Sequence, residues 1–298
     1  ASDVYKRQPQ PQTREHFAAL DIIGVRNIIV VQNKVEVVDR EGALENYRQI
    51  KNFLAGTWAE NAPIIPVSAL HKANVDVVLH AIEEYIPTPQ RDLSKDPLMF
   101  IARSFDVNRP GTPPEKLVGG VIGGSILQGA LRVGDEIEIL PGIRVQLPGG
   151  GYKYIPLHTE VVSLRFGDLL VEEAKPGGLV AIGTKLDPSL TKSDNLVGNI
   201  VGRPGRLPDV IYDVEIEYNL LERIVGTKEL IKASPLRKGE PLMLTVGTMI
   251  TLGIVAEVTK DVVRLKLSRP IVALRDFRVA ISRQIMGRWR LAGWGIIK

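Results

Sequence analysis

The fold of this chain is decided at residues 28–36, which read Ile28-Ile29-Val30-Val31-Gln32-Asn33-Lys34-Val35-Glu36. The β-branched apolar run predicts a buried strand, and the polar residues after it predict a loop. A second run, Ile64-Ile65-Pro66-Val67, ends in Ser68-Ala69. Between the two runs, residues 41–54 carry apolar side chains at helical spacing. This order predicts a parallel pair of strands whose polar loops meet at the carboxyl edge of the sheet, where such sheets bind ligands.

A further helix is expected after the second strand. Residues 75–86 place apolar side chains on one helical face, and Asn74 is positioned to cap that helix. Only two strands are expected before Pro87, which is too few for a complete sheet. We therefore expect residues 1–91 to form part of an α/β domain, and residues 1–90 alone not to fold stably.

The pattern changes beyond a polar, proline-rich linker at residues 87–97. Short runs with strand alternation recur between Gly and Pro turns, and a second turn cluster stands at residues 204–208. We expect two closed β-barrels, residues 92–206 and residues 207–298. The expected strands are 98–105, 120–126, 135–140, 159–164, 179–182 and 198–201 in the first barrel, and 210–221, 240–246, 253–258, 262–267, 278–282 and 289–297 in the second.

Composition excludes several classes of protein. The chain has no cysteine, so disulfides and thiolate metal sites are excluded, which is typical of the reducing cytoplasm. No apolar run reaches the roughly eighteen residues that span a bilayer, and no signal peptide is visible, so we expect a cytoplasmic protein. The four histidines share no ligand spacing, so neither a metal centre nor a Ser-His-Asp site is expected.

Positive charge is concentrated at the carboxyl end. The net charge is +4, yet residues 262–298 hold nine Lys/Arg and one acidic residue, Asp276. Two pairs, Arg264 with Lys266 and Arg288 with Arg290, each lie on one side of an expected strand, and we predict that they contact RNA phosphates. The alternative is a solvated barrel face. Trp289 and Trp294 are expected to be core anchors.

The two loops at the sheet edge resemble the guanine-reading loops of GTPases. Asn33–Glu36 differs by one residue from Asn-Lys-x-Asp, and Ser68-Ala69 matches the second loop. A carboxylate there accepts hydrogen bonds from guanine N1–H and the exocyclic amine, which adenine does not offer as a pair. Each such bond is worth about 1.5–3 kcal/mol.

By this resemblance, Glu36 reads the base, although its side chain is one methylene longer than Asp. Asn33 and Lys34 would support the loop and the base face. Ser68, Ala69 and Leu70 would complete the pocket.

The resemblance extends over most of the chain. Residues 120–139 look like the second domain of translational GTPases, a barrel that turns at Gly-Asp. Four further segments resemble the gamma subunit of archaeal and eukaryotic translation initiation factor two, with compact loops of the archaeal kind. They are residues 12–16, 59–69, 103–111 and 289–295. The fold that this implies is a partial P-loop GTPase sheet followed by two all-β barrels.

The family resemblance implies a function. Its members bind GTP or GDP with Mg²⁺, hydrolyse GTP, and carry methionyl initiator tRNA to the small ribosomal subunit as a heterotrimer with alpha and beta subunits. The second barrel would dock the alpha subunit. Two alternatives stay open: a nonenzymatic RNA- or subunit-binding scaffold, and another translational GTPase such as a selenocysteine-specific elongation factor.

One expected motif is absent from the sequence. No Gly-x-x-x-x-Gly-Lys-Ser/Thr occurs in it, so we expect an N-terminally truncated member without its phosphate and Mg²⁺ ligands, inactive as a GTPase. Residues 119–125 lack the lysine, and Asp21–Gly24 matches a switch motif only by its letters; both are predicted to be coincidental. Residues 3–8 back-translate to a transposase adapter, so we predict that residues 1–8 are non-native.

Overall fold

The predicted parallel pair is present. The computed structural model describes residues 11–221 and 234–298, and in it β1 (Val30–Asn33) pairs in parallel with β2 (Ile64–Val67). The chain divides into two compact units at Gln90/Arg91, and each is described by itself. No helix in the described ranges combines the length and the apolar character needed to cross a membrane.

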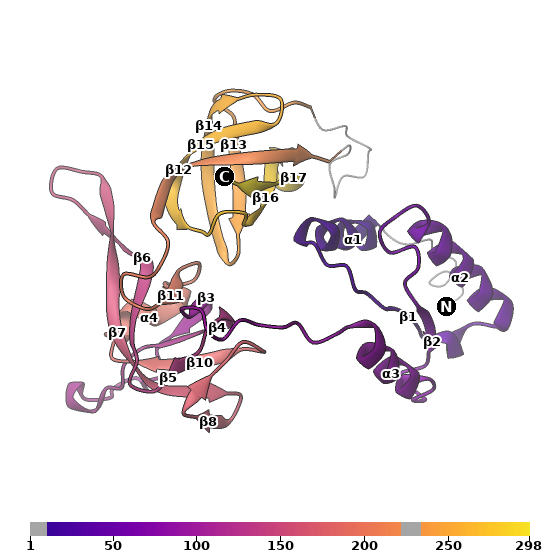
Figure 1. Cartoon of the computed structure of the whole chain (residues 1–298), viewed down its shortest axis with the longest axis horizontal. Coiled ribbons are helices and arrows are strands. Elements are labelled where there is room, and N and C mark those ends of the chain that lie inside the picture. The colour runs from indigo at the N-terminus through magenta and orange to yellow at the C-terminus, as the bar shows by residue number, and fades with distance from the viewer. Residues whose placement is uncertain (1–10, 222–233) are drawn as a thin grey trace. The chain divides into compact units, whose positions relative to one another are not determined.

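The first unit surrounds the two strands with helices (Figure 1). Its other elements are α1 (Pro11–Ile23), the 3-10 turn η2 (Val35–Val37), α2 (Arg40–Leu54) and α3 (Val75–Tyr85). Helix α2 begins where the Asp39 side chain accepts a hydrogen bond from the Gly42 N–H at 2.8 Å. Phe17 of α1 stacks on Trp58 with ring centroids 5.1 Å apart, which attaches α1 to the segment after α2.

The core of this unit is small. Its buried apolar residues are Ile22, Leu54, Ala59, Ile65, Val67 and Ala81. Val31, expected in a buried strand, is 45% exposed. That part of the prediction was wrong, because two strands and three helices supply too few layers to bury both faces of a parallel sheet.

The first barrel lies in the second unit. Its ring runs β10-β4-β3-β11-β6-β7 and closes because β7 also pairs with β10, while β8 extends the sheet. Its strands are β3 (Leu98–Phe105), β4 (Val121–Gln128), β6 (Glu136–Gln146), β7 (Tyr152–Phe166), β8 (Leu169–Val171), β10 (Val180–Thr184) and β11 (Ile200–Gly202). The short elements are η3 (Pro114–Lys116), β5 (Leu131–Arg132), β9 (Glu173–Ala174), α4 (Pro188–Thr191) and η4 (Lys192–Asp194).

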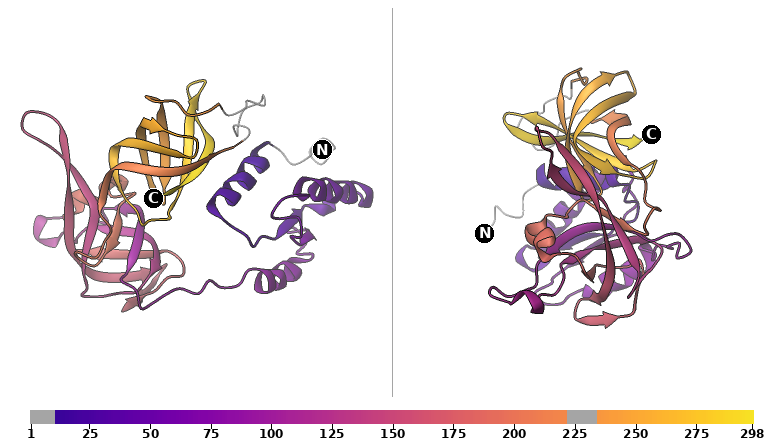
Figure 2. Two further views of the ribbon diagram at one scale, coloured as in Figure 1. Left: turned by 45° about the horizontal axis from the view of Figure 1, so that its top comes forward. Right: turned by 90° about the vertical axis from the view of Figure 1, so that its left-hand side faces the viewer.

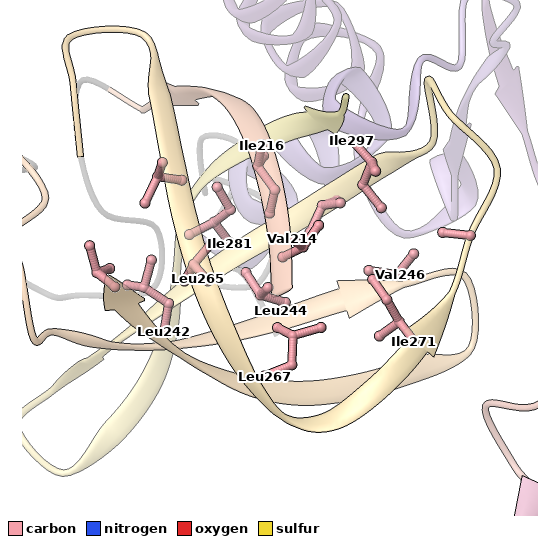
Figure 3. Packing of buried hydrophobic residues seen from close by; sticks show 14 of the residues in the cluster. Val214, Ile216, Leu242, Leu244, Val246, Leu265, Leu267, Ile271, Ile281 and Ile297 are labelled. Atoms are coloured by element: carbon pink, nitrogen blue, oxygen red, sulfur yellow. The ribbon is translucent and has the colours of Figure 1, made fainter. Parts of the chain in front are cut away.

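The second barrel is closed in the order β12-β15-β14-β13-β16-β17. Its strands are β12 (Val210–Leu220), β13 (Pro241–Val246), β14 (Met249–Val258), β15 (Val262–Val272), β16 (Arg278–Ile285) and β17 (Arg288–Ile297). Alternate residues of these strands, among them Leu244 and Leu265, point inward and interdigitate (Figure 3). The expected barrels of six strands are therefore confirmed.

The two barrels share a hydrophobic contact. Phe100 of β3 packs against Phe277 with ring centroids 5.6 Å apart. Beside them, Leu140 and Ile200 of the first barrel cluster with Val272 of the second. The contact makes the barrels one compact unit.

One strand pair is longer than predicted. Strand β6 runs on to Gln146 and β7 begins at Tyr152, whereas the sequence predicted strands only at residues 135–140 and 159–164. The additional residues form a hairpin that extends beyond the ring of the barrel (Figures 1 and 2).

Candidate functional site

The two predicted loops leave the sheet side by side. In the register of β1 and β2, Asn33 lies opposite Val67, so the residues after them start from neighbouring strand ends. Lys34 has φ of 67° and turns the chain from β1 into η2. The sequence prediction that these loops meet at one sheet edge is confirmed.

The side chain of Asn33 connects the loops. Its Oδ1 accepts hydrogen bonds from the Lys34 N–H at 2.8 Å and from the Ala69 N–H at 3.1 Å. A single side-chain oxygen therefore holds the first loop against the second. This is a supporting role of the kind expected for Asn33.

Glu36 lies against the second loop. A hydrogen bond from the Ser68 hydroxyl, followed by one from its own backbone N–H, holds the pKa of the Glu36 carboxyl below its ordinary value. Burial raises this pKa by less, and the positive charges of His71 and Lys34 lower it further. The carboxylate is therefore the charged form at neutral pH and is oriented by its neighbour.

The second loop is tightly folded around Ser68. Ser68 is 3% exposed, its Oγ accepts a hydrogen bond from the His71 N–H at 3.2 Å, and its backbone pairs with Ala73. Leu70, at the tip, is 76% exposed. The structure thus brings Ser68 toward Glu36 and leaves the Leu70 side chain in solvent.

Asn74 occupies the predicted N-cap position of α3, but its side chain does not make the expected capping hydrogen bond. Asn74 precedes α3 with φ of 58° and makes no side-chain cap; its Nδ2 donates to the Pro66 carbonyl at 2.8 Å instead. The side chain therefore links the start of α3 to β2.

Sequence reasoning missed Gln32. It is buried in β1, and its Nε2 donates to the Ala43 carbonyl at 2.8 Å and to Asn46 Oδ1 at 3.0 Å. These bonds attach α2 to the strand that carries the first loop. The glutamine within the apolar run could have predicted such a contact, because a buried side-chain amide needs a hydrogen-bond partner.

The two loops and the Glu36 carboxylate fit a purine that offers two neighbouring N–H hydrogen-bond donors. A carboxylate has about four acceptor positions, so the bond from Ser68 to Glu36 leaves others for a ligand. Residues 11–221 and 234–298 contain no group of three His, Asp or Glu side chains that could hold a metal ion.

The two segments that match GTPase motifs only by coincidence, residues 119–125 and Asp21–Gly24, have structural roles. A Cβ on Gly124 would lie 1.8 Å from the Phe100 carbonyl oxygen, so this glycine permits close strand packing in the barrel. Gly24 follows α1 with φ of 85°, the usual conformation after a helix, and Asp21 pairs with Arg26 at 2.7 Å.

The predicted RNA-contacting cations differ in their surroundings. Arg264 and Lys266 are exposed on β15 as expected, but Arg264 pairs with Glu215 at 3.2 Å and Glu257 at 3.7 Å. Lys266 stands opposite Asp213 in the neighbouring strand. The acidic residues lie on β12 and β14, outside the basic segment, so the charge count of residues 262–298 missed them.

Arg288 and Arg290, on β17, have no ion pair within the described residues. Trp289 and Trp294 are half-buried and lie outside the barrel core, so the prediction of core anchors was wrong. Arg278 lies over the Trp294 ring, 5.3 Å from its centroid, which places that ring among surface cations.

Comparison with known families identifies both ends of the chain. Residues 4–88 match the family described as Elongation factor Tu GTP binding domain, and residues 212–297 match Initiation factor eIF2 gamma, C terminal. The translation initiation factor 2 subunit gamma of Aeropyrum pernix is 64% identical, over 97% of this chain and 70% of the relative. That of Pyrococcus furiosus is 62% identical over the same shares.

Solved structures support the fold. A bacterial selenocysteine-specific elongation factor superposes with a TM-score of 0.74 at 19% identity, covering 98% of this chain and 43% of the other. The elongation factor SelB of Methanococcus maripaludis, in its apo form, gives 0.74 at 22% identity, over 99% and 64%. These likenesses show the fold, an α/β unit followed by two barrels, and the sequence identities of the relatives show the family. The chain belongs to the family of the gamma subunit of translation initiation factor 2.

Proposed function

We propose that the chain reads guanine with Glu36 and acts as the nucleotide-dependent, tRNA-carrying subunit of an initiation factor. The observation that carries the proposal is the convergence of two loops, in which Asn33 joins the strand ends and Ser68 orients the Glu36 carboxylate. Lys34, Ala69 and Leu70 belong to the same loops and would line the base. The family identity supports guanine over other purines.

The longer side chain of Glu36 is compatible with this role. The hydrogen bond from Ser68 lowers the pKa of this carboxyl, so the charged form is available to accept hydrogen bonds from an incoming base. A base without the exocyclic amine would lose one charge-assisted hydrogen bond. That loss is worth about 1.5–3 kcal/mol, or roughly 10–150-fold in affinity.

The test is a comparison of GDP with inosine diphosphate, which lacks the amine. A hybrid protein would carry this chain in place of the matched 290 residues of the Aeropyrum pernix subunit. We expect the hybrid to prefer GDP by at least about tenfold, and Glu36→Ala to bring the two affinities close together. Glu60→Ala, at an exposed acidic residue in another loop, is the matched control.

An unchanged ratio of GDP to inosine diphosphate affinity in Glu36→Ala would contradict the assignment. If instead the hybrid bound neither nucleotide, the nonenzymatic RNA- or subunit-binding scaffold would be the better account. A competition with ATP in the same hybrid separates purine binding in general from guanine reading.

The finer assignments follow from the family resemblance. We assign methionyl initiator tRNA as the cargo, the small ribosomal subunit as its destination, alpha and beta subunits as partners, and the cytoplasm as the place of action. Docking of the alpha subunit on the second barrel belongs to this proposal. GTP hydrolysis with Mg²⁺ belongs to the family, and the 298-residue chain by itself is proposed to be inactive, because it contains no Gly-x-x-x-x-Gly-Lys-Ser/Thr.

The predicted RNA-contacting cations of the second barrel allow two tests of tRNA binding. Removing Arg288 and Arg290 should lower the salt dependence of tRNA binding, because neither has an ion pair in the described part of the chain. Removing Arg264 should change it less, because two carboxylates already neutralise that charge. If the variants that lack Arg264, Arg288 or Arg290 all show the same salt dependence of tRNA affinity as the unaltered chain, these residues form a solvated barrel face.

A further inference from the structure

The hairpin between β6 and β7 stands outside the barrel ring. Strand β6 pairs with β11 only at Glu138–Leu140, and β7 pairs with β10 only from Val161 to Arg165. Beyond these ladders, Ile143–Gln146 and Tyr152–Ile155 pair with one another alone among the described residues. Figures 1 and 2 show the resulting ribbon projecting from the first barrel. Among the described residues of the ribbon, Ile143 packs against the core of the first barrel, and the face opposite Ile143 contributes nothing to that core.

The register sorts the side chains of the ribbon onto these faces. Arg144 lies opposite Tyr154, and Gln146 lies opposite Tyr152. Residues directly opposite each other, and residues two apart along a strand, share a face. One face of the ribbon therefore carries an arginine, a glutamine and two tyrosines.

Of the two aromatic side chains on this face, Tyr152 is exposed and Tyr154 is half-buried. Tyr152 is 54% exposed, and the Arg144 guanidinium carbon lies 3.4 Å from the centroid of its ring. The guanidinium is held over the ring by a cation–π contact, so the face presents a planar cation beside a second aromatic ring, Tyr154. Planar groups of this kind are platforms on which unpaired bases stack.

The charge of the ribbon points to the same class of ligand. From Ile139 to Leu157 the sequence contains Arg144 and Lys153 and no Asp or Glu, whereas His158, at the base of the ribbon, lies 3.7 Å from Glu138. This differs from β15 of the second barrel, where Arg264 is paired with two carboxylates. An uncompensated cationic ribbon attracts a polyanion.

We propose that the face formed by Arg144, Gln146, Tyr152 and Tyr154 binds single-stranded RNA. Bases stack on the tyrosines and on the Arg144 guanidinium, Gln146 hydrogen-bonds base edges, and Lys153, on the opposite face, adds to the field that attracts phosphates. The site is separate from the guanine-reading loops and from the cations of the second barrel. It requires unpaired bases, because a duplex offers no exposed base faces along its length.

The test uses the full 298-residue chain and a fluorescein-labelled single-stranded RNA of about ten nucleotides in an anisotropy titration. The double variant Tyr152→Leu with Tyr154→Leu keeps apolar strand residues but removes the rings, and should weaken binding about tenfold. Tyr152→Phe with Tyr154→Phe retains the rings and should bind as the unaltered chain does. Arg144→Gln should reduce both the affinity and its salt dependence.

Tyr212→Leu is the matched control, since Tyr212 is a similarly exposed tyrosine on a strand of the second barrel. A thermal melt verifies that each variant folds. Photo-crosslinking with 4-thiouridine RNA, followed by peptide mapping, provides a readout that does not depend on variants and should label the segment containing Tyr152. Competition by duplex RNA of the same length should be weaker than competition by single strands.

Three results would each overturn the proposal. The first is equal RNA affinity for the leucine variant and the unaltered chain. The second is crosslinks confined to other segments. The third is loss of binding to a partner protein in the leucine variant with RNA affinity unchanged, which would assign the face to a protein instead.

Discussion

The second barrel and the N-terminal α/β unit differ in how completely each encloses itself. The barrel closes every strand onto a neighbour and buries a continuous cluster from all six of its strands. The α/β unit has two paired strands, and apolar side chains of its helices, such as Leu79, remain largely exposed. A closed barrel has no free edge, whereas a short open sheet leaves backbone donors and acceptors without partners.

The most stable part of the chain and the part that carries the candidate site are therefore different. The loops proposed to read guanine lie on the weakly enclosed unit, and the two barrels form the well-packed unit. Loops on a marginal element can rearrange at low cost, which suits a nucleotide-dependent switch.

The largest effect is expected from separating the two units. Residues 91–298 alone should melt cooperatively, because both barrel cores and the contact between them lie within that segment. Residues 1–90 alone should show no cooperative transition. Circular dichroism and calorimetry measure both, and a cooperative melt of residues 1–90 would remove the contrast.

The next largest effect concerns core packing. Leu265→Ala, at a fully buried position in the second barrel, should lower the free energy of unfolding by about 3–5 kcal/mol, from lost burial and the cavity that remains. Leu79→Ala in α3, where the side chain is 61% exposed, should change it by less than about 0.5 kcal/mol. Urea unfolding of the full chain measures both. Similar costs would mean that the α/β unit is packed as well as the barrel.

A smaller effect is expected from ion pairs. Arg283 binds Glu240 through two bonds, of 2.5 and 2.9 Å, with side chains only 10% and 19% exposed. Glu240→Ala should cost about 3 kcal/mol, because it leaves a buried guanidinium short of acceptors. Glu45→Ala, which breaks an exposed pair with Arg48 on α2, should cost less than about 1 kcal/mol. If Glu240→Ala and Glu45→Ala lower the free energy of unfolding equally in urea, the second barrel does not enclose its ion pair more than the α/β unit does.

The smallest effect is a shift in titration. Ser68→Ala should raise the pKa of Glu36 toward its ordinary value, because the Ser68 hydroxyl is the largest cause of its lowering. A carboxyl whose pKa is lowered by folding stabilises the fold above its ordinary pKa, and this contribution is lost as the pH falls through the lowered value. Side-chain NMR titration measures the change.

Ser94→Ala is the control for this titration. It should raise the pKa of Asp92, which Ser94 lowers, and leave Glu36 unchanged. If Ser68→Ala leaves the Glu36 titration where it was, the two loops are not coupled through this hydrogen bond.

The sequence by itself determined the order and kind of the elements. Alternating apolar residues predicted twelve barrel strands, because period-two burial is a local pattern. The apolar runs at residues 28–32 and 64–67, each followed by a polar motif and separated by a helical pattern, predicted the parallel pair. The family motifs likewise depend on residues that are near one another in the chain.

Only the tertiary structure decided which side chains meet across those elements. The bond from Ala69 to Asn33, the pairing of Arg264 with Glu215 and Glu257, and the stacking of Arg144 on Tyr152 each join residues from different strands or loops. The exposure of Val31 and Trp294 was set by which layers the fold supplies around them. Local patterns carry no information on such pairs, because strand register and layer packing depend on the whole fold.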